Sequence, residues 1–397
     1  MSASLSTASA GTFAPDRIAR WSAALLFVQV VIWGYAALNA YGPAETLTRP
    51  TSIDFNSFYA AGLLAKAGTP ELAYNHAAHL AVQEALVGGQ GGIYQFFYYP
   101  PVFLMLCAAL ARLSYGMAYL LFAVGGVALY ALVSWAIVRR RGLAMLLPFI
   151  AFPAVFFNVI WGQNGLLTAS LFGGALLALE ERPVLAGLLF GLICYKPQFG
   201  LLIPLALAAG CHWRAIAAAA VTVIVLCLGS LWILGAAAWT AFFANAMTAP
   251  ATFTTGAVLF FGFASPFGGL RSVGMPVDIA MTAQLVVTFI AAIAIVAVWH
   301  SRRPQGLKAA MLLAGAFVAV PTAFYYDLAL DAVAAAWLVY EGELDDRSML
   351  GLAALWGAAL LVPFLWNFTP IVSVTAFTFF AFVALRALRF DHTARAI

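Results

Sequence analysis

Long apolar segments separated by short polar connections dominate the chain from residue 18 onward. A helix that crosses a bilayer needs about 20 apolar residues, or somewhat fewer where other helices surround it. Another apolar stretch, 101–113, is shorter, at about 20 Å of helix, and is predicted to dip into the membrane and return. The twelve predicted spans are 18–40, 117–138, 143–160, 164–180, 183–195, 198–211, 214–236, 277–299, 307–321, 324–340, 349–365 and 369–389.

Positive charges decide the orientation of these spans, because cytoplasmic loops carry an excess of Lys and Arg. With a cytoplasmic N-terminus and a re-entrant 101–113, 14 of the 19 Lys and Arg residues lie inside, among them the arginines at 139–141. If 101–113 crossed the membrane, every later loop would change side. The sequence therefore predicts cytoplasmic N- and C-termini and two long external connections, 41–116 and 237–276.

Composition agrees with this interpretation. The chain is 64% hydrophobic and 9% charged, whereas a soluble domain is about 45–50% apolar and about 25% charged. This excludes a water-soluble fold and a disordered chain, and the four cysteines, all in apolar segments without a CxxC pair, do not indicate a disulfide or zinc framework. We predict a single all-α polytopic membrane domain over 1–397, with no cleavable signal peptide.

The first external connection contains two polar helical segments, 56–67 and 70–87, which are expected to lie flat at the interface. Asp54 precedes the first of them. Its carboxylate could cap that helix, or it could act as a general base that takes a proton from a hydroxyl. His76 and His79 are spaced to share a metal ion, but no third ligand is nearby, so no metal is predicted.

Two further motifs place polar side chains at the external ends of spans. Tyr98 and Tyr99 precede a rigid Pro-Pro pair and could be interfacial aromatics or substrate contacts. Gln163 and Asn164 follow Trp161 in a tight turn. Their amides could simply complete the turn, or they could contact sugar hydroxyls, because an amide both donates and accepts hydrogen bonds.

Lys196 lies at the outer end of a short apolar segment, GLICYKPQFG. An unpaired charge there costs several kcal/mol, so Lys196 either snorkels to the headgroups or binds an anion such as a lipid-linked phosphate. Arg271 is a second phosphate candidate. In PTAFYYDLALD, Tyr326 and Asp327 are candidate sugar contacts, and Asp327 and Asp331 lie one turn apart. This acidic pair could bind a sugar, pair with one of the cations or, less favoured, relay protons or cations.

These motifs resemble glycosyltransferase family 87 of the GT-C membrane proteins, the DUF2029 family, which includes polyprenol-phosphate-mannose-dependent α-mannosyltransferases. The resemblance covers roughly residues 50–340 and is carried by DFNSFYAAGLLAKAG, YPP, WGQN and RPVLAGLLFGLICYKPQFGLLIPLALAAGCHWRA. The late segment PTAFYYD departs from the aromatic and histidine-containing segment of mycobacterial members. This departure leaves the sugar and the acceptor open.

The resemblance implies a GT-C-like fold and a hexosyltransferase that moves a sugar, such as mannose, from a polyprenyl-phosphate donor to a lipid or glycan acceptor. It places Asp54 at the position of the GT-C catalytic acid and implies a single displacement with inversion at the external face of a bacterial plasma membrane. Lys196 and Arg271 are the predicted phosphate contacts. No cofactor besides the lipid-linked donor is expected, and no nucleic acid. The predicted substrate contacts are Tyr98, Tyr99, Gln163, Asn164, Tyr326 and Asp327.

Two other interpretations remain. A transporter or flippase would explain the many spans and the intramembrane charges, but it explains poorly the long external connections and the lack of a visible internal repeat. A non-enzymatic scaffold for envelope assembly would be favoured if Asp54 were a buried cap with no adjoining cavity.

Overall fold

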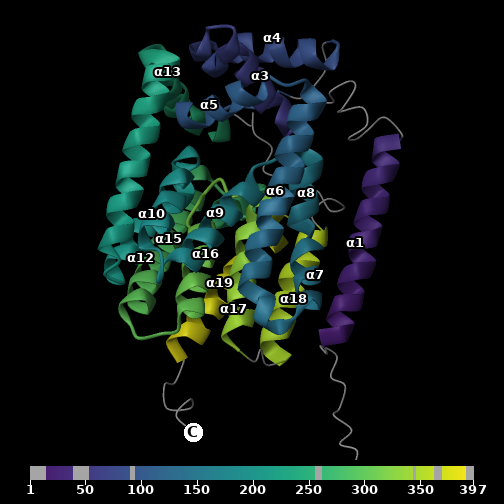
Figure 1. The fold of residues 1–397 in the computed structure, drawn as a ribbon, viewed down its shortest axis with the longest axis vertical. Coiled ribbons are helices and arrows are strands. Elements are labelled where there is room, and N and C mark those ends of the chain that lie inside the picture. Colours follow the sequence, from purple (N-terminus) through teal and green to yellow (C-terminus); the bar gives the residue numbers. More distant parts are fainter. Residues whose placement is uncertain are drawn as a thin grey trace, which may run out of the picture.

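The computed structural model (Figure 1) describes residues 15–38, 53–89, 94–254, 262–342, 346–361 and 369–389. These residues form helices and no strand, apart from an isolated bridge between Phe263 and Phe324. The α-helices are α1 (Pro15–Leu38), α3 (Asp54–Lys66), α4 (His76–Val87), α5 (Pro101–Leu110), α6 (Tyr115–Val138), α7 (Leu147–Ile150), α8 (Pro153–Trp161), α9 (Gly165–Ala178), α10 (Pro183–Leu192), α11 (Pro197–Gly200), α12 (Ile203–Ala209), α13 (Trp213–Thr254), α14 (Pro266–Ser272), α15 (Val277–His300), α16 (Gln305–Val318), α17 (Ala329–Glu341), α18 (Asp346–Leu361) and α19 (Thr369–Arg389). The short 3-10 helices are η1 (Pro70–Tyr74), η2 (Arg139–Arg141), η3 (Leu143–Leu146), η4 (Ile193–Tyr195) and η5 (Tyr325–Leu328).

The helices form a bundle that is covered at one end by α3, α4 and α5 (Figure 1). Helix α1 begins and α19 ends at the opposite end. Helix α6 runs from the α3–α5 layer to that same end, so the arginines of η2, which follow α6 directly, also lie there. The charged cluster at 139–141 and both described ends of the chain are therefore separated from the α3–α5 layer by the length of the bundle.

The core of the bundle is apolar and built around α16 and α17, whose residues are almost all buried. The outward faces of α6, α13 and α15 also carry large exposed apolar side chains, for example Val124, Val225 and Phe289. A surface of this kind, extending over several helices, is typical of contact with a membrane. These helices indicate an integral membrane protein.

Close packing of α10 against α13 depends on two glycines four residues apart. A Cβ added at Gly187 would lie 2.3 Å from the backbone oxygen of Ala215, and one added at Gly191 would lie 2.5 Å from the Cβ of Thr222. Small residues at this spacing let two helix backbones approach closely, which is how helices associate when lipid removes the hydrophobic driving force between them.

Four described helices are long and apolar enough to cross a membrane: 115–141, 213–248, 277–300 and 369–389. Helices 143–150 and 153–161 add a fifth if they are counted as one span bent by 54°. In its described residues, each of the twelve predicted spans overlaps helical structure, but several of these helices have only 10 to 17 residues. The number of crossings therefore stays a prediction.

The two long connections differ from the sequence-based expectation. Helices α3 and α4 form as predicted, but α3 is enclosed rather than interfacial, since every residue from Phe55 to Gly62 is buried. The first part of the predicted connection 237–276 is helical, because α13 continues to Thr254 across a break at Gly235. The φ of 80° and ψ of 166° at Gly235 are accessible essentially only to glycine. The external position of this connection stays a prediction. Residues 1–14, on which the signal-peptide expectation rests, and 39–52, 90–93 and 255–261 lie outside the described residues.

Candidate functional site

The turn between α8 and α9 lies directly on the first turn of α3. Gly162 forms this turn with a φ of 64°, in the left-handed region, where glycine has no steric penalty. A Cβ on Gly162 would also come within 2.5 Å of the Cβ of Phe55. Glycine is therefore needed here twice, once for the backbone conformation and once for the close approach that brings the next residue, Gln163, beside Asp54.

Asp54 is the first residue of α3, and its side chain does not cap the helix. The N-cap is Ile53, which has no side chain able to cap, so the capping interpretation of Asp54 is wrong. The carboxylate oxygen Oδ2 instead accepts a hydrogen bond of 2.5 Å from Nε2 of Gln163. The structure thus places a carboxylate at the positive end of a helix dipole and leaves its Oδ1 without a hydrogen bond from the described residues.

The surroundings of Asp54 favour a carboxyl group that changes its charge near neutral pH. Burial raises the pKa of Asp54 from its usual value of 3.8 to about 6, and the hydrogen bond from Gln163 opposes this rise. The residue nevertheless keeps some exposure to solvent. A carboxylate with these properties is a suitable general base.

Lys196 forms a buried ion pair with Asp327. Its Nζ lies 2.6 Å from Oδ1 of Asp327 and donates a second hydrogen bond of 3.1 Å to Oδ1 of Asn164. The rings of Phe199 and Tyr326 lie 4.9 and 5.5 Å from Nζ. Lys196 is 4% exposed and Asp327 is 1% exposed, so the snorkelling interpretation is wrong. Of the alternatives for Asp327, its pairing with Lys196 is the one that these contacts support.

The Asp54 contact and the Lys196 ion pair meet at the α8–α9 turn, because Oε1 of Gln163 accepts a hydrogen bond of 3.3 Å from the backbone N–H of Asn164. Tyr99 joins the same region. Burial raises its pKa well above the usual value, the carboxylates of Asp327 and Asp54 raise it further, and a hydrogen bond with Asn164 opposes the shift. We call the set Asp54, Gln163, Asn164, Lys196 and Asp327 the polar network.

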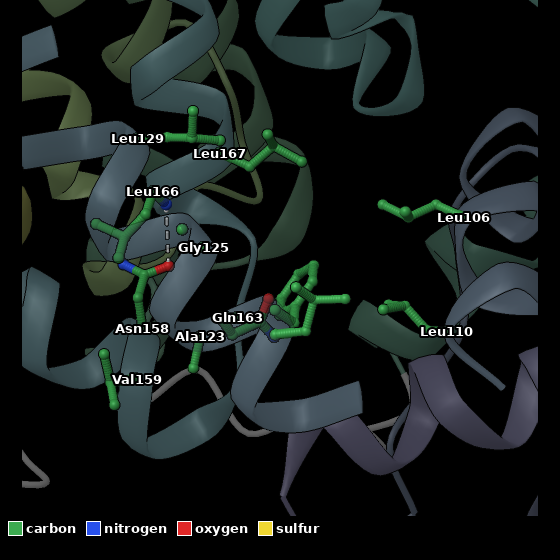
Figure 2. Close-up of a pocket in the computed structure, with 13 residues that line it drawn as sticks. Leu106, Leu110, Ala123, Gly125, Leu129, Asn158, Val159, Gln163, Leu166 and Leu167 are labelled. Atoms are coloured by element: carbon green, nitrogen blue, oxygen red, sulfur yellow. Dashed lines mark hydrogen bonds between the residues drawn. The ribbon is translucent and has the colours of Figure 1, made fainter. Parts of the chain in front are cut away.

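An apolar cavity of about 200 Å³ reaches the polar network from the side of the bundle. Leu106 and Leu110 of α5 lie on one side of it and Leu129 of α6 and Leu167 of α9 on the other, with Gln163 between them (Figure 2). Leu106 and Leu129 are 38% and 47% exposed, so the cavity opens at the apolar outer surface. Its polar lining residues are Asn158 and Gln163, and Gln163 is the residue that hydrogen-bonds Asp54.

Other candidates lie outside the polar network. Nη1 of Arg271 donates to the carbonyl of Met275, just beyond its own helix, α14. The ring of Tyr98 stacks on Phe96 at 5.4 Å. Asp331 is fully buried, and neither carboxylate oxygen has a hydrogen-bond partner among the described residues.

The two histidines serve structural contacts. Nε2 of His79 donates to the carbonyl of Ser57 at 3.0 Å, and burial lowers the pKa of His79 to about 4. His76 stacks on Tyr94 at 4.0 Å. Among the described residues, no three or more His, Cys, Asp or Glu side chains are grouped so that they could hold a metal ion.

Sequence reasoning missed Asn158, which holds this region together. Its Nδ2 donates to the carbonyl of Tyr326 at 2.8 Å, and its Oδ1 accepts from the backbone N–H of Leu166 at 3.2 Å. It therefore connects α8, α9 and the 3-10 helix η5, which carries Asp327. The available signal was a lone amide within the apolar run PAVFFNVIW, since a polar side chain there needs a partner.

Comparison with known proteins decides the family. The sequence model of glycosyltransferase family 87 matches residues 97–324. The chain belongs to glycosyltransferase family 87. The match includes four residues gathered around the α8–α9 turn, namely Tyr99, Gln163, Asn164 and Lys196, whereas Asp54 and Asp327 lie outside the matched range. Searches of curated proteins and of solved structures gave no match.

Proposed function

We propose that this membrane glycosyltransferase transfers a hexose, such as mannose, from a polyprenyl-phosphate donor to a lipid or glycan acceptor, with Asp54 as the general base. The observation that carries the proposal is the position of Asp54, whose carboxylate accepts a hydrogen bond from Gln163, a residue that lines an apolar cavity open at the side of the bundle. Such a cavity suits the isoprenoid tail of a lipid-linked donor. A carboxylate one hydrogen bond beyond the lining of this cavity suits the deprotonation of an acceptor hydroxyl.

The proposed reaction is a single displacement with inversion. Oδ1 of Asp54 takes the proton of the acceptor hydroxyl, the hydroxyl oxygen forms a bond to the anomeric carbon, and the bond from that carbon to the phosphate oxygen breaks. The polyprenyl phosphate leaves with the electron pair. Because phosphate is already a good leaving group, a cationic group that stabilises its charge is enough, and no general acid is needed.

Lys196 is the first candidate for this cationic group. An ammonium has three N–H bonds. Among the described residues, Asp327 and Asn164 accept hydrogen bonds from two of them. The third is available for a phosphate oxygen. Arg271 remains the second candidate. Tyr98, Tyr99, Asn164, Tyr326 and Asp327 are the proposed contacts to sugar and acceptor.

The same proposal includes the sidedness of the protein. We place both termini in the cytoplasm and the α3–α5 layer on the external face of a bacterial plasma membrane. Support comes from Figure 1, where α6 and the two described ends of the chain reach one end of the bundle and the α3–α5 layer lies at the other. The arginines of η2 follow α6 directly. Positive residues favour the cytoplasmic side.

Detergent-purified protein tests the proposal against the transporter alternative. We expect it to convert a radiolabelled polyprenyl-phosphate hexose and a lipid extract into a new labelled product without any sealed compartment. A transporter or flippase would need vesicles and would leave the donor intact. If a panel of such donors that includes mannose and glucose gives no product, the proposed donor class is wrong.

Activity is expected to depend on pH through Asp54. Its carboxyl group must be ionised to accept a proton, so kcat/KM should fall about tenfold per pH unit below a midpoint near 6 and level off above it. The measurement is kcat/KM from about pH 4.5 to about pH 8 at saturating acceptor. A profile that stays flat down to about pH 4.5 would exclude Asp54 as the group that titrates.

A further inference from the structure

The side-chain amide of Gln163 has a defined orientation in the polar network. A carboxylate oxygen can only accept, so the atom of Gln163 that lies 2.5 Å from Oδ2 of Asp54 must be the NH₂ group. The other end of the same amide, Oε1, accepts the backbone N–H of Asn164. The two hydrogen bonds therefore agree on one orientation of the amide. Both its NH₂ group and its Oε1 already have a protein partner and need no contact with a substrate.

The backbone of Gln163 is also fixed. Its N–H donates to the carbonyl of Asn158 at 2.8 Å, Gly162 before it lies against Phe55, and the side chain of Asn164 after it is held by Lys196. These contacts come from α3, α8 and the Lys196–Asp327 pair. The side chain that reaches Asp54 is thus supported from three directions.

We propose that Gln163 is a positioning residue that holds Oδ2 of Asp54 and so turns Oδ1 toward the acceptor hydroxyl, rather than a residue that binds the sugar. The Lys196–Asp327 pair supports the same arrangement through Asn164. This inference rests on the proposed function, since it assigns a role relative to the general base. It changes the expectation for Gln163, which as a sugar contact would have affected mainly the affinity for substrate.

The two roles predict different kinetic changes in Gln163→Ala. Loss of a hydrogen bond to the ionised carboxylate favours the protonated form, so the acid limb of kcat/KM should move to higher pH by about one unit. This substitution replaces none of the other ionisable groups around Asp54, namely Tyr99, Tyr325, Tyr326 and the Lys196–Asp327 pair. Above the new midpoint kcat should remain about tenfold lower because Asp54 is less well oriented, while KM for the sugar donor should stay within about twofold.

Gln163→Glu provides a sharper test, because it keeps the size of the side chain but replaces the donor by a second carboxylate. The acid limb should move further than in Gln163→Ala, since a like charge at this distance strongly favours one protonated carboxyl group. Gln305→Ala, which alters a glutamine at the start of α16, is the matched control and should keep the wild-type profile.

Infrared difference spectroscopy reads the ionisation of Asp54 without any substrate. The carboxyl band that disappears in Asp54→Asn should titrate at higher pH in Gln163→Ala than in wild type. If the band keeps its midpoint in both Gln163 variants, or if they raise KM for the donor without changing the pH limb, the positioning role is wrong while the proposed function stands. If Asp54→Asn keeps full activity, Asp54 is not the general base and the proposed mechanism is wrong.

Discussion

Asp54→Asn is expected to lower sugar transfer by a factor of about 10² to 10⁴, the usual contribution of a general base. The asparagine retains the shape of the side chain and can still accept the hydrogen bond from Gln163, but it cannot take a proton from the acceptor. The measurement is kcat with a radiolabelled polyprenyl-phosphate hexose at saturating donor and acceptor. Asp54→Glu should keep partial activity, since a carboxylate remains but is displaced by one methylene.

Asp54→Asn should be at least as stable as wild type, so its loss of activity would reflect lost chemistry and not a lost fold. Burial raises the folded-state pKa of Asp54 from 3.8 to about 6. A carboxyl group with a raised pKa contributes its full stability below about pH 3.8 and loses it as the pH rises to about 6. Above that range the ionised group costs up to about 3 kcal/mol, which Asp54→Asn removes.

Asp278→Asn is the matched control for both measurements. Asp278 lies in the first turn of α15, as Asp54 lies in the first turn of α3, but it is exposed. Its replacement should change neither turnover nor the thermal unfolding midpoint at neutral pH. Full turnover in Asp54→Asn, with an unfolding midpoint equal to that of wild type, would show that another group accepts the proton.

The sequence could identify Lys196 and Asp327 because each is a charged side chain in an apolar segment, whereas Asp54 was identified by its place before a loop helix and by the family resemblance. Lys196 and Asp327 are 131 positions apart, and the cost of burying either charge alone indicated that each needs a partner, with this pairing as one of the alternatives. The WGQN turn was also recognisable, since glycine followed by two amides fits a tight turn with hydrogen-bonding groups. These inferences depend on the cost of burial, which can be judged from local sequence.

The direction of each side chain could not be predicted in the same way. Gln163 was expected to face a sugar and instead faces Asp54, because the close approach of Gly162 to Phe55 depends on how α3 packs. The second long connection, 237–276, was predicted as the stretch between the spans 214–236 and 277–299. Its alanine-rich segment instead continues α13 as a helix that packs on η1 and α5, and such tertiary contacts are absent from local sequence.

Helix lengths are a further difference that has a physical reason. Helices α9, α16 and α17 have 14, 14 and 13 residues, shorter than an ordinary membrane span. The residues of α16 and α17 are almost entirely buried by other helices, and most of those of α9 are buried too. A helix inside the bundle contacts protein rather than lipid, so its polar ends can be satisfied by neighbouring side chains, as Asn158 does for the backbone of η5 and α9.

Breaking the Lys196–Asp327 pair is expected to be the most destabilising single change in the site. Lys196→Met leaves the Asp327 carboxylate buried without its partner, and Asp327→Asn leaves the Lys196 ammonium in the same position. Removal of one member of a buried ion pair typically costs about 3–5 kcal/mol. Each single variant should therefore show a large fall in its thermal unfolding midpoint in detergent micelles.

The double variant Lys196→Met with Asp327→Asn distinguishes a structural pair from a catalytic cation. Because no uncompensated charge remains, its unfolding midpoint should lie above that of either single variant. If Lys196 also stabilises the leaving phosphate, the double variant should remain at least 10²-fold less active although it is folded. Lys308→Met, which alters a lysine of α16 outside the polar network, should match wild type in both measurements. A stable double variant with wild-type turnover would limit the pair to supporting the α8–α9 turn and would exclude Lys196 from phosphate binding.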